Sequence, residues 1–108
     1  MAKRVPKRLS KSSPGLPSWT FLTNHAHVLI CITKNHDVRL AEIALLVGIG
    51  ERAVHSIVQD LVEAGYVIKA KTGRSNSYKV RLNHPFRHPL ESEHQIVEVF
   101  GPLTKDLR

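Results

Sequence analysis

The sequence lacks several features that define common protein classes. Cys31 is the single cysteine among 108 residues, so an internal disulfide is excluded and a reducing compartment is expected. No apolar run is long enough to span a bilayer. The N-terminal cations are not followed by an apolar stretch, so we expect no secretory signal. Together these absences predict a cytoplasmic protein with no membrane partner.

Catalytic motifs are missing as well. The sequence contains no glycine-rich phosphate-binding loop, and no serine or cysteine lies in a nucleophile motif. The carboxylates fall on helix faces that are expected to be exposed to solvent. We therefore expect a protein that is not an enzyme, with no catalytic residue and no cofactor.

Acidic residues are few compared with basic ones. Sixteen lysines and arginines outnumber nine acids, which gives a net charge of +7. Residues 1–17 and residues 66–81 each hold five cations and no acid. Two basic regions on a nearly neutral body are better explained by binding to a polyanionic partner than by a general need for solubility. The length indicates one domain, and residues 1–18 are expected to form a disordered basic arm.

The spacing of apolar residues predicts two consecutive helices in the middle of the chain. Apolar residues recur at i, i+3, i+4 and i+7 from Leu40 to Val47, and Gly48 then ends the helix. After a short turn, the second helix is expected over residues 51–64, with one apolar side. The opposite side carries Arg52, His55, Ser56, Gln59 and Glu63.

A basic β-hairpin is predicted directly after the second helix. Val67, Ile68, Tyr78 and Val80 are strand formers, and residues 72–77 have turn chemistry. Residues 38–39 are a candidate for a short third strand beside the hairpin. The order helix, turn, helix, basic hairpin is typical of a winged helix-turn-helix. This α+β fold has a three-helix core and a two- or three-stranded β-wing.

Two further helices are expected to pack on this unit. The first spans about residues 24–34 with Thr23 as its cap, and it is apolar on all sides. Its outer apolar faces must be covered by the C-terminal segment, by residues 19–21 or by a second subunit. A short C-terminal helix is predicted after a capping box of Ser92 and Gln95.

Two details of these outer helices lead to separate expectations. Gly101 and Pro102 are expected to end the C-terminal helix early. Leu45 and Leu46 lie off the apolar stripe of their helix. They either contact the first or the last helix, or form an apolar patch for a partner subunit.

His25, His27 and Cys31 suggest a metal-sensing site as an alternative. On a helix, residues two apart point about 200° away from each other, so the two histidines cannot bind one ion. His27 and Cys31 share a face, but a structural zinc site needs four ligands. Packed histidines and a buried thiol are favoured, and we expect no bound metal.

Four short motifs carry a resemblance to a known family. They are Arg39-Leu-Ala-Glu-Ile-Ala, Val47-Gly-Ile-Gly-Glu-Arg-Ala-Val, Asp60-Leu-Val-Glu-Ala-Gly-Tyr and Gly73-Arg-Ser-Asn-Ser-Tyr78. They resemble the winged helix DNA-binding domains of bacterial transcriptional regulators, most of all the MarR-like group. The resemblance covers about residues 19–91 and implies the fold and DNA binding. Gly50 stands where such sequences usually carry a serine or threonine cap.

The sequence thus predicts a transcriptional regulator, in the first place a repressor, that binds double-stranded DNA sequence-specifically in the bacterial cytoplasm and nucleoid. A homodimer is expected, and a small-molecule effector is left open. Residues 19–90 would form the DNA-binding domain, and residues 91–108 a C-terminal helix and tail for packing or dimerisation. The candidates for base contacts in the major groove are Arg52, His55, Ser56 and Gln59. The wing candidates for the backbone or minor groove are Lys69, Lys71, Arg74, Asn76 and Lys79.

Two other functions fit the same residues. The first alternative is a winged helix that binds an acidic protein through its basic wing. A weaker alternative is a metal- or thiol-responsive repressor that uses Cys31.

Overall fold

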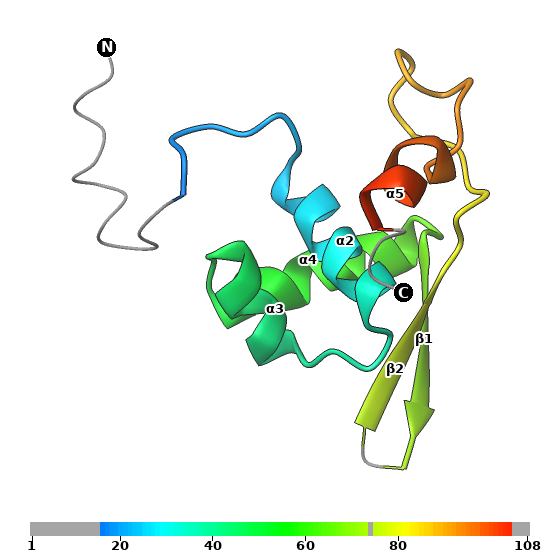
Figure 1. Ribbon diagram of the computed structural model, residues 1–108. Coiled ribbons are helices and arrows are strands. Elements are labelled where there is room, and N and C mark those ends of the chain that lie inside the picture. The colour runs from blue at the N-terminus through cyan, green and yellow to red at the C-terminus, as the bar shows by residue number, and fades with distance from the viewer. Residues whose placement is uncertain (1–15, 74, 105–108) are drawn as a thin grey trace.

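The computed structural model describes residues 16–73 and 75–104, which form four helices and a β-hairpin (Figure 1). In chain order the elements are α2 (Asn24–Lys34), α3 (Leu40–Val47), α4 (Glu51–Glu63), β1 (Val67–Thr72), β2 (Ser75–Val80) and α5 (Val97–Thr104). The expectation of an α+β protein is confirmed. Most of the expected basic arm, the wing residue Arg74 and residues 105–108 lie outside the described residues.

Local sequence explains the bounds of the first three helices, which agree with the predicted ones within a residue. Helix α2 begins after Thr23, whose Oγ1 accepts a hydrogen bond from the Ala26 N–H at 3.2 Å. Helix α3 ends at Gly48, whose φ of 89° lies in the left-handed region that favours glycine. Helix α4 follows Gly50, which offers no side-chain cap.

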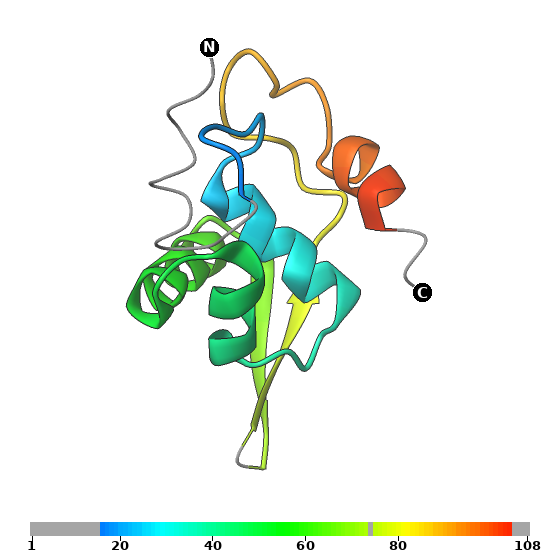
Figure 2. The same cartoon turned by 60° about the vertical axis from the view of Figure 1, so that its left-hand side comes forward.

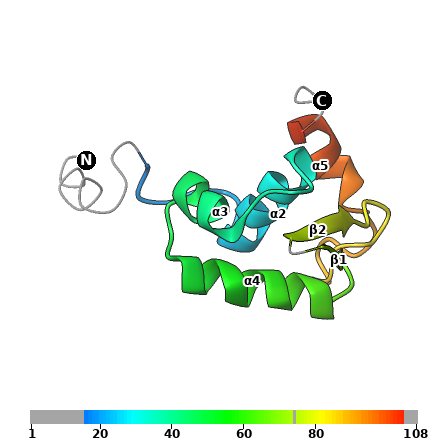
Figure 3. The same cartoon turned by 90° about the horizontal axis from the view of Figure 1, so that it is seen from below.

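Helix α2 lies at the centre of the molecule, between α4 and α5 (Figure 3). Its Val28 and Ile32 are fully buried, and they share one core with Ile43 of α3 and Val54 of α4. Phe100 of α5 is also buried in this core. The C-terminal segment thus covers part of the apolar surface of α2. Trp19 and Phe21 are 67% and 92% exposed, and residues 16–20 line a groove beside α2.

The two strands pair in an antiparallel hairpin with Val67 opposite Val80 and Thr72 opposite Ser75. The connecting loop has only two residues, and it begins with Gly73 at a φ of 66°. The expected turn over residues 72–77 is thus too long, because Asn76 lies inside β2, opposite Lys71. Strand pairing continues close to the tip because short two-residue loops match the twist of a hairpin.

The candidate third strand at residues 38–39 is not present in the described sheet, which has two strands. Instead, His36 contacts β2 just before this segment. The Tyr78 N–H donates to the His36 carbonyl at 2.9 Å, and His36 Nδ1 lies 3.0 Å from the Tyr78 carbonyl oxygen. These two bonds fix the α2–α3 connection to the hairpin without a further strand.

The prediction of a Ser92–Gln95 capping box was wrong. Residues 84–86 pair with residues 94–96, through hydrogen bonds from Ile96 N–H to the His84 carbonyl and from Phe86 N–H to the His94 carbonyl. This pairing holds residues 94–96 in an extended bridge, so the helix starts only at Val97.

The predicted early end of α5 was also wrong, because the helix runs through Pro102 to Thr104. The burial of Phe100 and one hydrogen bond support this second turn. In that bond the Thr104 hydroxyl donates to the Phe100 carbonyl at 2.7 Å. Among the described residues, no helix has both the length and the apolar composition to cross a membrane.

Candidate nucleic-acid interface

Helix α4 has one buried and one exposed side. Val54, Ile57, Val58 and Leu61 are buried against the core. Since an α-helix turns once in 3.6 residues, the positions between them face solvent. The structure leaves all four predicted base-contacting residues exposed on this side: Arg52, His55, Ser56 and Gln59.

The exposed side of α4 is not uniformly basic. Glu51, Asp60 and Glu63 are exposed there beside the single cation Arg52. Glu51 lies in the first turn, where the helix dipole favours a carboxylate. Asp60 and Glu63 lie in the last two turns. The second half of the outer face is therefore acidic, whereas the first half carries one cation and one anion.

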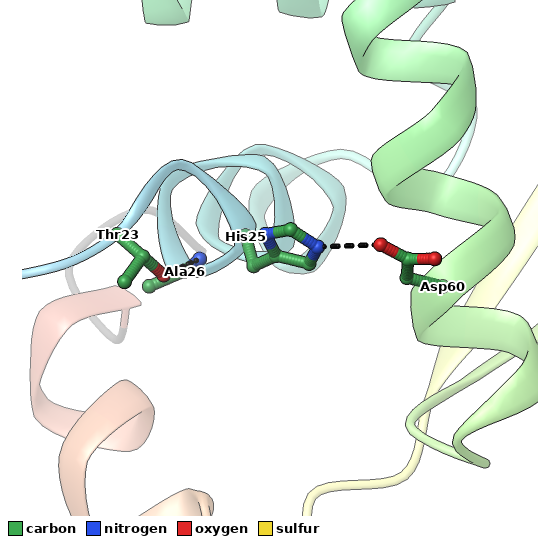
Figure 4. Close-up of polar contacts among 4 residues, drawn as sticks. All are labelled: Thr23, His25, Ala26 and Asp60. Atoms are coloured by element: carbon green, nitrogen blue, oxygen red, sulfur yellow. Dashed lines mark hydrogen bonds and ion pairs between the residues drawn. The ribbon is translucent and has the colours of Figure 1, made fainter.

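Asp60 is bound by a histidine of α2 (Figure 4). His25 Nε2 and Asp60 Oδ2 are 2.8 Å apart, with the ring N–H donating to the carboxylate. The cap made by Thr23 sets the start of α2 and so the place of the His25 ring. Both side chains are about half exposed, so the pair contributes at most about 1 kcal/mol to stability. Its structural role is to orient Asp60 and to connect α2 with α4.

Sequence reasoning missed this contact because His25 and Asp60 are 35 positions apart. No local pattern links residues at such a separation. The sequence favours packed histidines over a metal site, and the contact with Asp60 supplies the partner of His25.

The α3–α4 connection consists of residues 48–50. Ile49, between Gly48 and Gly50, is partly buried and packs against the core, as expected for a residue that fills the gap between two helices. The Ile49 N–H donates to the Ala44 carbonyl at 3.1 Å, which keeps the turn tight. Helix α3 therefore holds the start of α4, and with it Arg52, in a fixed position.

The hairpin extends beyond the helices, and Figures 1 and 2 show the far ends of its two strands at one end of the molecule. Its predicted wing residues within the described chain are all exposed: Lys69, Lys71, Asn76 and Lys79. Cross-strand partners lie on the same face of a sheet. Lys69 is opposite Tyr78, whereas Lys79 is opposite Ile68. The hairpin thus carries cations on both faces.

A second feature is a groove of about 700 Å³ between α2, α3 and residues 16–20. His27 and Cys31 both line it, as their shared helix face predicted. Burial raises the pKa of the Cys31 thiol, and nearby Lys34 opposes this only partly. A raised thiol pKa favours the unreactive protonated form. Within residues 16–73 and 75–104, no three His, Cys, Asp or Glu side chains gather as a metal site would require.

Leu45 and Leu46 are 83% and 70% exposed. Both side chains are thus turned mainly to solvent and are not buried against the first or the last helix. Leu46 lines the groove that contains Cys31, together with Trp19. The apolar-patch alternative agrees with this exposure.

A third feature is an apolar groove of about 590 Å³, which we call the α2–α5 groove. Its walls come from the start of α2, the end of α4, residues 86–91 and α5. Tyr66 lines the groove, and its hydroxyl donates to the Pro85 carbonyl at 2.7 Å. Burial raises the pKa of Tyr66, while Arg87 and Glu91 on the rim act in opposite directions on it.

Comparison with known proteins leaves this geometry as the basis for assigning a function. No protein-family model matches the chain, and no curated protein matches it.

Proposed function

We propose that the chain is a winged helix-turn-helix protein that binds double-stranded DNA sequence-specifically. It would act as a transcriptional regulator, with repression favoured over activation. The observation that carries the proposal is an exposed helix face beside an exposed basic hairpin. Arg52, His55, Ser56 and Gln59 lie on the former, and Lys69, Lys71 and Lys79 on the latter.

The division of charge assigns a different role to each part. Lysines on both faces of the hairpin would contact phosphates, which supplies affinity without reading sequence. The first half of α4 would lie in the major groove, where arginine pairs with guanine and glutamine with adenine. Asp60 and Glu63 would stay at the far end of the helix, and His25 already binds Asp60.

Selection of bound sequences from a random duplex pool at physiological salt tests this proposal. We expect enrichment of a motif, and a two-fold symmetric one if the protein acts as the expected homodimer. Arg52→Ala and Gln59→Ala should each cost about 1–3 kcal/mol on the enriched site and relax the preference at one position. Gln95→Ala is the matched control. Gln95 is also an exposed glutamine, but it lies next to α5, outside α4 and the hairpin.

An absence of binding to any duplex would contradict the proposal. Binding without enrichment would contradict the sequence-specific part and leave a general DNA-binding protein.

The second candidate function is a winged helix that binds an acidic protein through the hairpin. The three carboxylates on the exposed side of α4 favour it, since they oppose a DNA backbone near that helix. In that case, replacing Lys69, Lys71 and Lys79 by glutamine would abolish binding. Arg52→Ala and Gln59→Ala would leave it unchanged.

A further inference from the structure

We propose that the outer edge of β1 binds an acidic, extended segment of another protein as an additional antiparallel strand. The inference rests on the second candidate function, the binding of an acidic protein through the hairpin, and it names how that partner is held. It does not depend on DNA binding.

Backbone hydrogen bonds show which groups of β1 point away from β2. The Arg81 N–H donates to the Tyr66 carbonyl at 2.8 Å, one residue before the first strand pair. In an antiparallel hairpin, pairs that are hydrogen-bonded to each other alternate with pairs whose N–H and C=O groups point outward. Every second residue of β1 from Ile68 on is therefore bonded to β2. The N–H and C=O groups of Lys69 and Lys71 point outward, and we call these four groups the β1 edge.

The opposite strand has the same alternation, and its own edge is already covered. Tyr78 is opposite Lys69, and its N–H donates outward to the His36 carbonyl at 2.9 Å. Within residues 16–73 and 75–104, no backbone hydrogen bond of this kind reaches the β1 edge. Figures 1 and 2 show no other element of the described chain beside the far end of β1. Backbone groups left open at a sheet edge are a template for a further strand.

The β1 edge requires a partner with both donors and acceptors. Lys69 and Lys71 each offer one N–H and one C=O along the edge. A DNA backbone has acceptors only, so it could bind the N–H groups but would leave the two carbonyls without a donor. A polypeptide strand presents N–H and C=O groups in the same alternation. The β1 edge therefore fits a polypeptide better than a DNA backbone.

Charge selects the chemistry of the added strand. Directly opposite residues of an antiparallel pair lie on the same face, with their Cβ atoms about 4.5–5.5 Å apart. Acidic residues are therefore favoured opposite Lys69 and Lys71, and residues 66–81 contain no acid that would compete for these lysines. The residue between them falls on the other face, beside Ala70 and the 44% exposed Ile68, where an apolar side chain is favoured. The expected partner is an extended segment in which acidic and β-branched apolar residues alternate.

A second copy of β1 does not meet this requirement. Two copies paired along this edge would place a lysine opposite a lysine, and like charges directly opposite each other are destabilising. Edge lysines of this kind protect a sheet from pairing with its own copies. The same lysines leave the edge open to an acidic strand.

The first test uses a labelled synthetic peptide in which glutamate alternates with valine. The full chain is titrated into it without DNA, and fluorescence anisotropy reports binding. In the proposed antiparallel pair the glutamate N–H groups donate to β1, whereas the valine N–H groups point away. Methylation of the glutamate amide nitrogens should therefore weaken binding at least about tenfold, because two donors are lost. The matched control carries the same number of methyl groups on the valine amides and should keep most of the affinity.

Hydrogen exchange of the full chain, followed by NMR, locates the bound peptide. At saturation with the glutamate–valine peptide, the N–H groups of Lys69 and Lys71 should exchange at least about tenfold more slowly. The N–H groups of Ile68 and Ala70 are already directed to β2 and provide the internal control. Their exchange should change less.

Reversal of the edge charge gives a third test. Lys69→Glu combined with Lys71→Glu should abolish binding of the glutamate–valine peptide and create binding of a lysine–valine peptide. This gain shows that the variant is folded. Lys34→Glu combined with Arg87→Glu is the matched control, since it changes the net charge equally at exposed residues outside the hairpin. It should still bind the glutamate–valine peptide.

Three results would overturn the inference. One is a glutamate–valine peptide that the chain does not bind. Another is equal binding of the two methylated peptides, because charge alone would then hold them. The third is unchanged exchange at Lys69 and Lys71 with the peptide bound. The second and third results would leave the binding of an acidic protein by the hairpin intact, so the inference and the function on which it rests fail separately.

Discussion

The division of lysines between the two faces of the hairpin leads to a quantitative prediction for DNA binding. Lys69 and Lys71 lie on the face that includes Tyr78, and Lys79 lies on the opposite face, next to Ile68. A hairpin that enters a groove edge-on contacts phosphates with both faces. A hairpin that lies flat on the backbone uses one face only.

The magnitude follows from the release of counterions. Each phosphate contact by a lysine contributes about 0.9 to the slope of log affinity against log salt concentration. For an edge-on hairpin, Lys69→Gln with Lys71→Gln should reduce the slope by about 1.8, and Lys79→Gln should reduce it by about 0.9. For a flat hairpin, only one of the two sets of substitutions should reduce the slope.

The assay is fluorescence anisotropy of a labelled duplex, titrated with protein at several salt concentrations. All three lysines are exposed, so the substitutions should leave the melting temperature unchanged. Lys34→Gln is the control, because Lys34 is an exposed lysine at the end of α2, outside α4 and the hairpin. If neither set of hairpin variants changes the slope, the hairpin does not contact phosphates and the reasoning is refuted.

Two further predictions concern stability and pH. Gly50→Ser should stabilise the fold by about 0.5–1 kcal/mol, because a serine cap suits its extended backbone and the new Cβ meets nothing within 4 Å. Gly65→Ser should lower the free energy of unfolding by about 1–2 kcal/mol, because φ is +88° and the new Cβ lies 3.2 Å from His84 Nε2. Melting temperatures of the two variants that shift in the same direction would contradict this pair of predictions. The Gln95 N–H and the ring of His94 hold the Glu98 carboxylate and lower its pKa, and Glu98 raises the pKa of His94. This contact at the start of α5 should therefore weaken as pH falls through the Glu98 pKa and as pH rises through the His94 pKa. Glu98→Gln should return the His94 pKa toward 6.5 in an NMR titration, and an unchanged pKa would exclude the contact.

The sequence alone was sufficient for the elements that local rules control. Apolar spacing and a left-handed glycine fixed the bounds of α3, and the Thr23 cap fixed the start of α2. The same spacing identified which side of α4 is exposed, and hence Arg52 and Gln59 as candidates. These features depend on residues within one or two turns of each other, which is the range over which helix periodicity and capping act.

The structure corrected the sequence where distant segments compete with local preferences. Ser92 and Gln95 form a good capping pattern, but pairing with residues 84–86 extends this part of the chain and delays α5. Leu45 is apolar yet 83% exposed, whereas Ile43 of the same helix is fully buried.

Only the tertiary structure could show which residues from separate elements share a surface. The contact between His25 and Asp60 depends on the crossing of α2 over α4. The α2–α5 groove exists because α5 packs against α2 and brings Leu90 to the same rim as Phe21. Neither is visible in the sequence, because periodicity gives the face of one helix but not the distance and angle at which two helices pack.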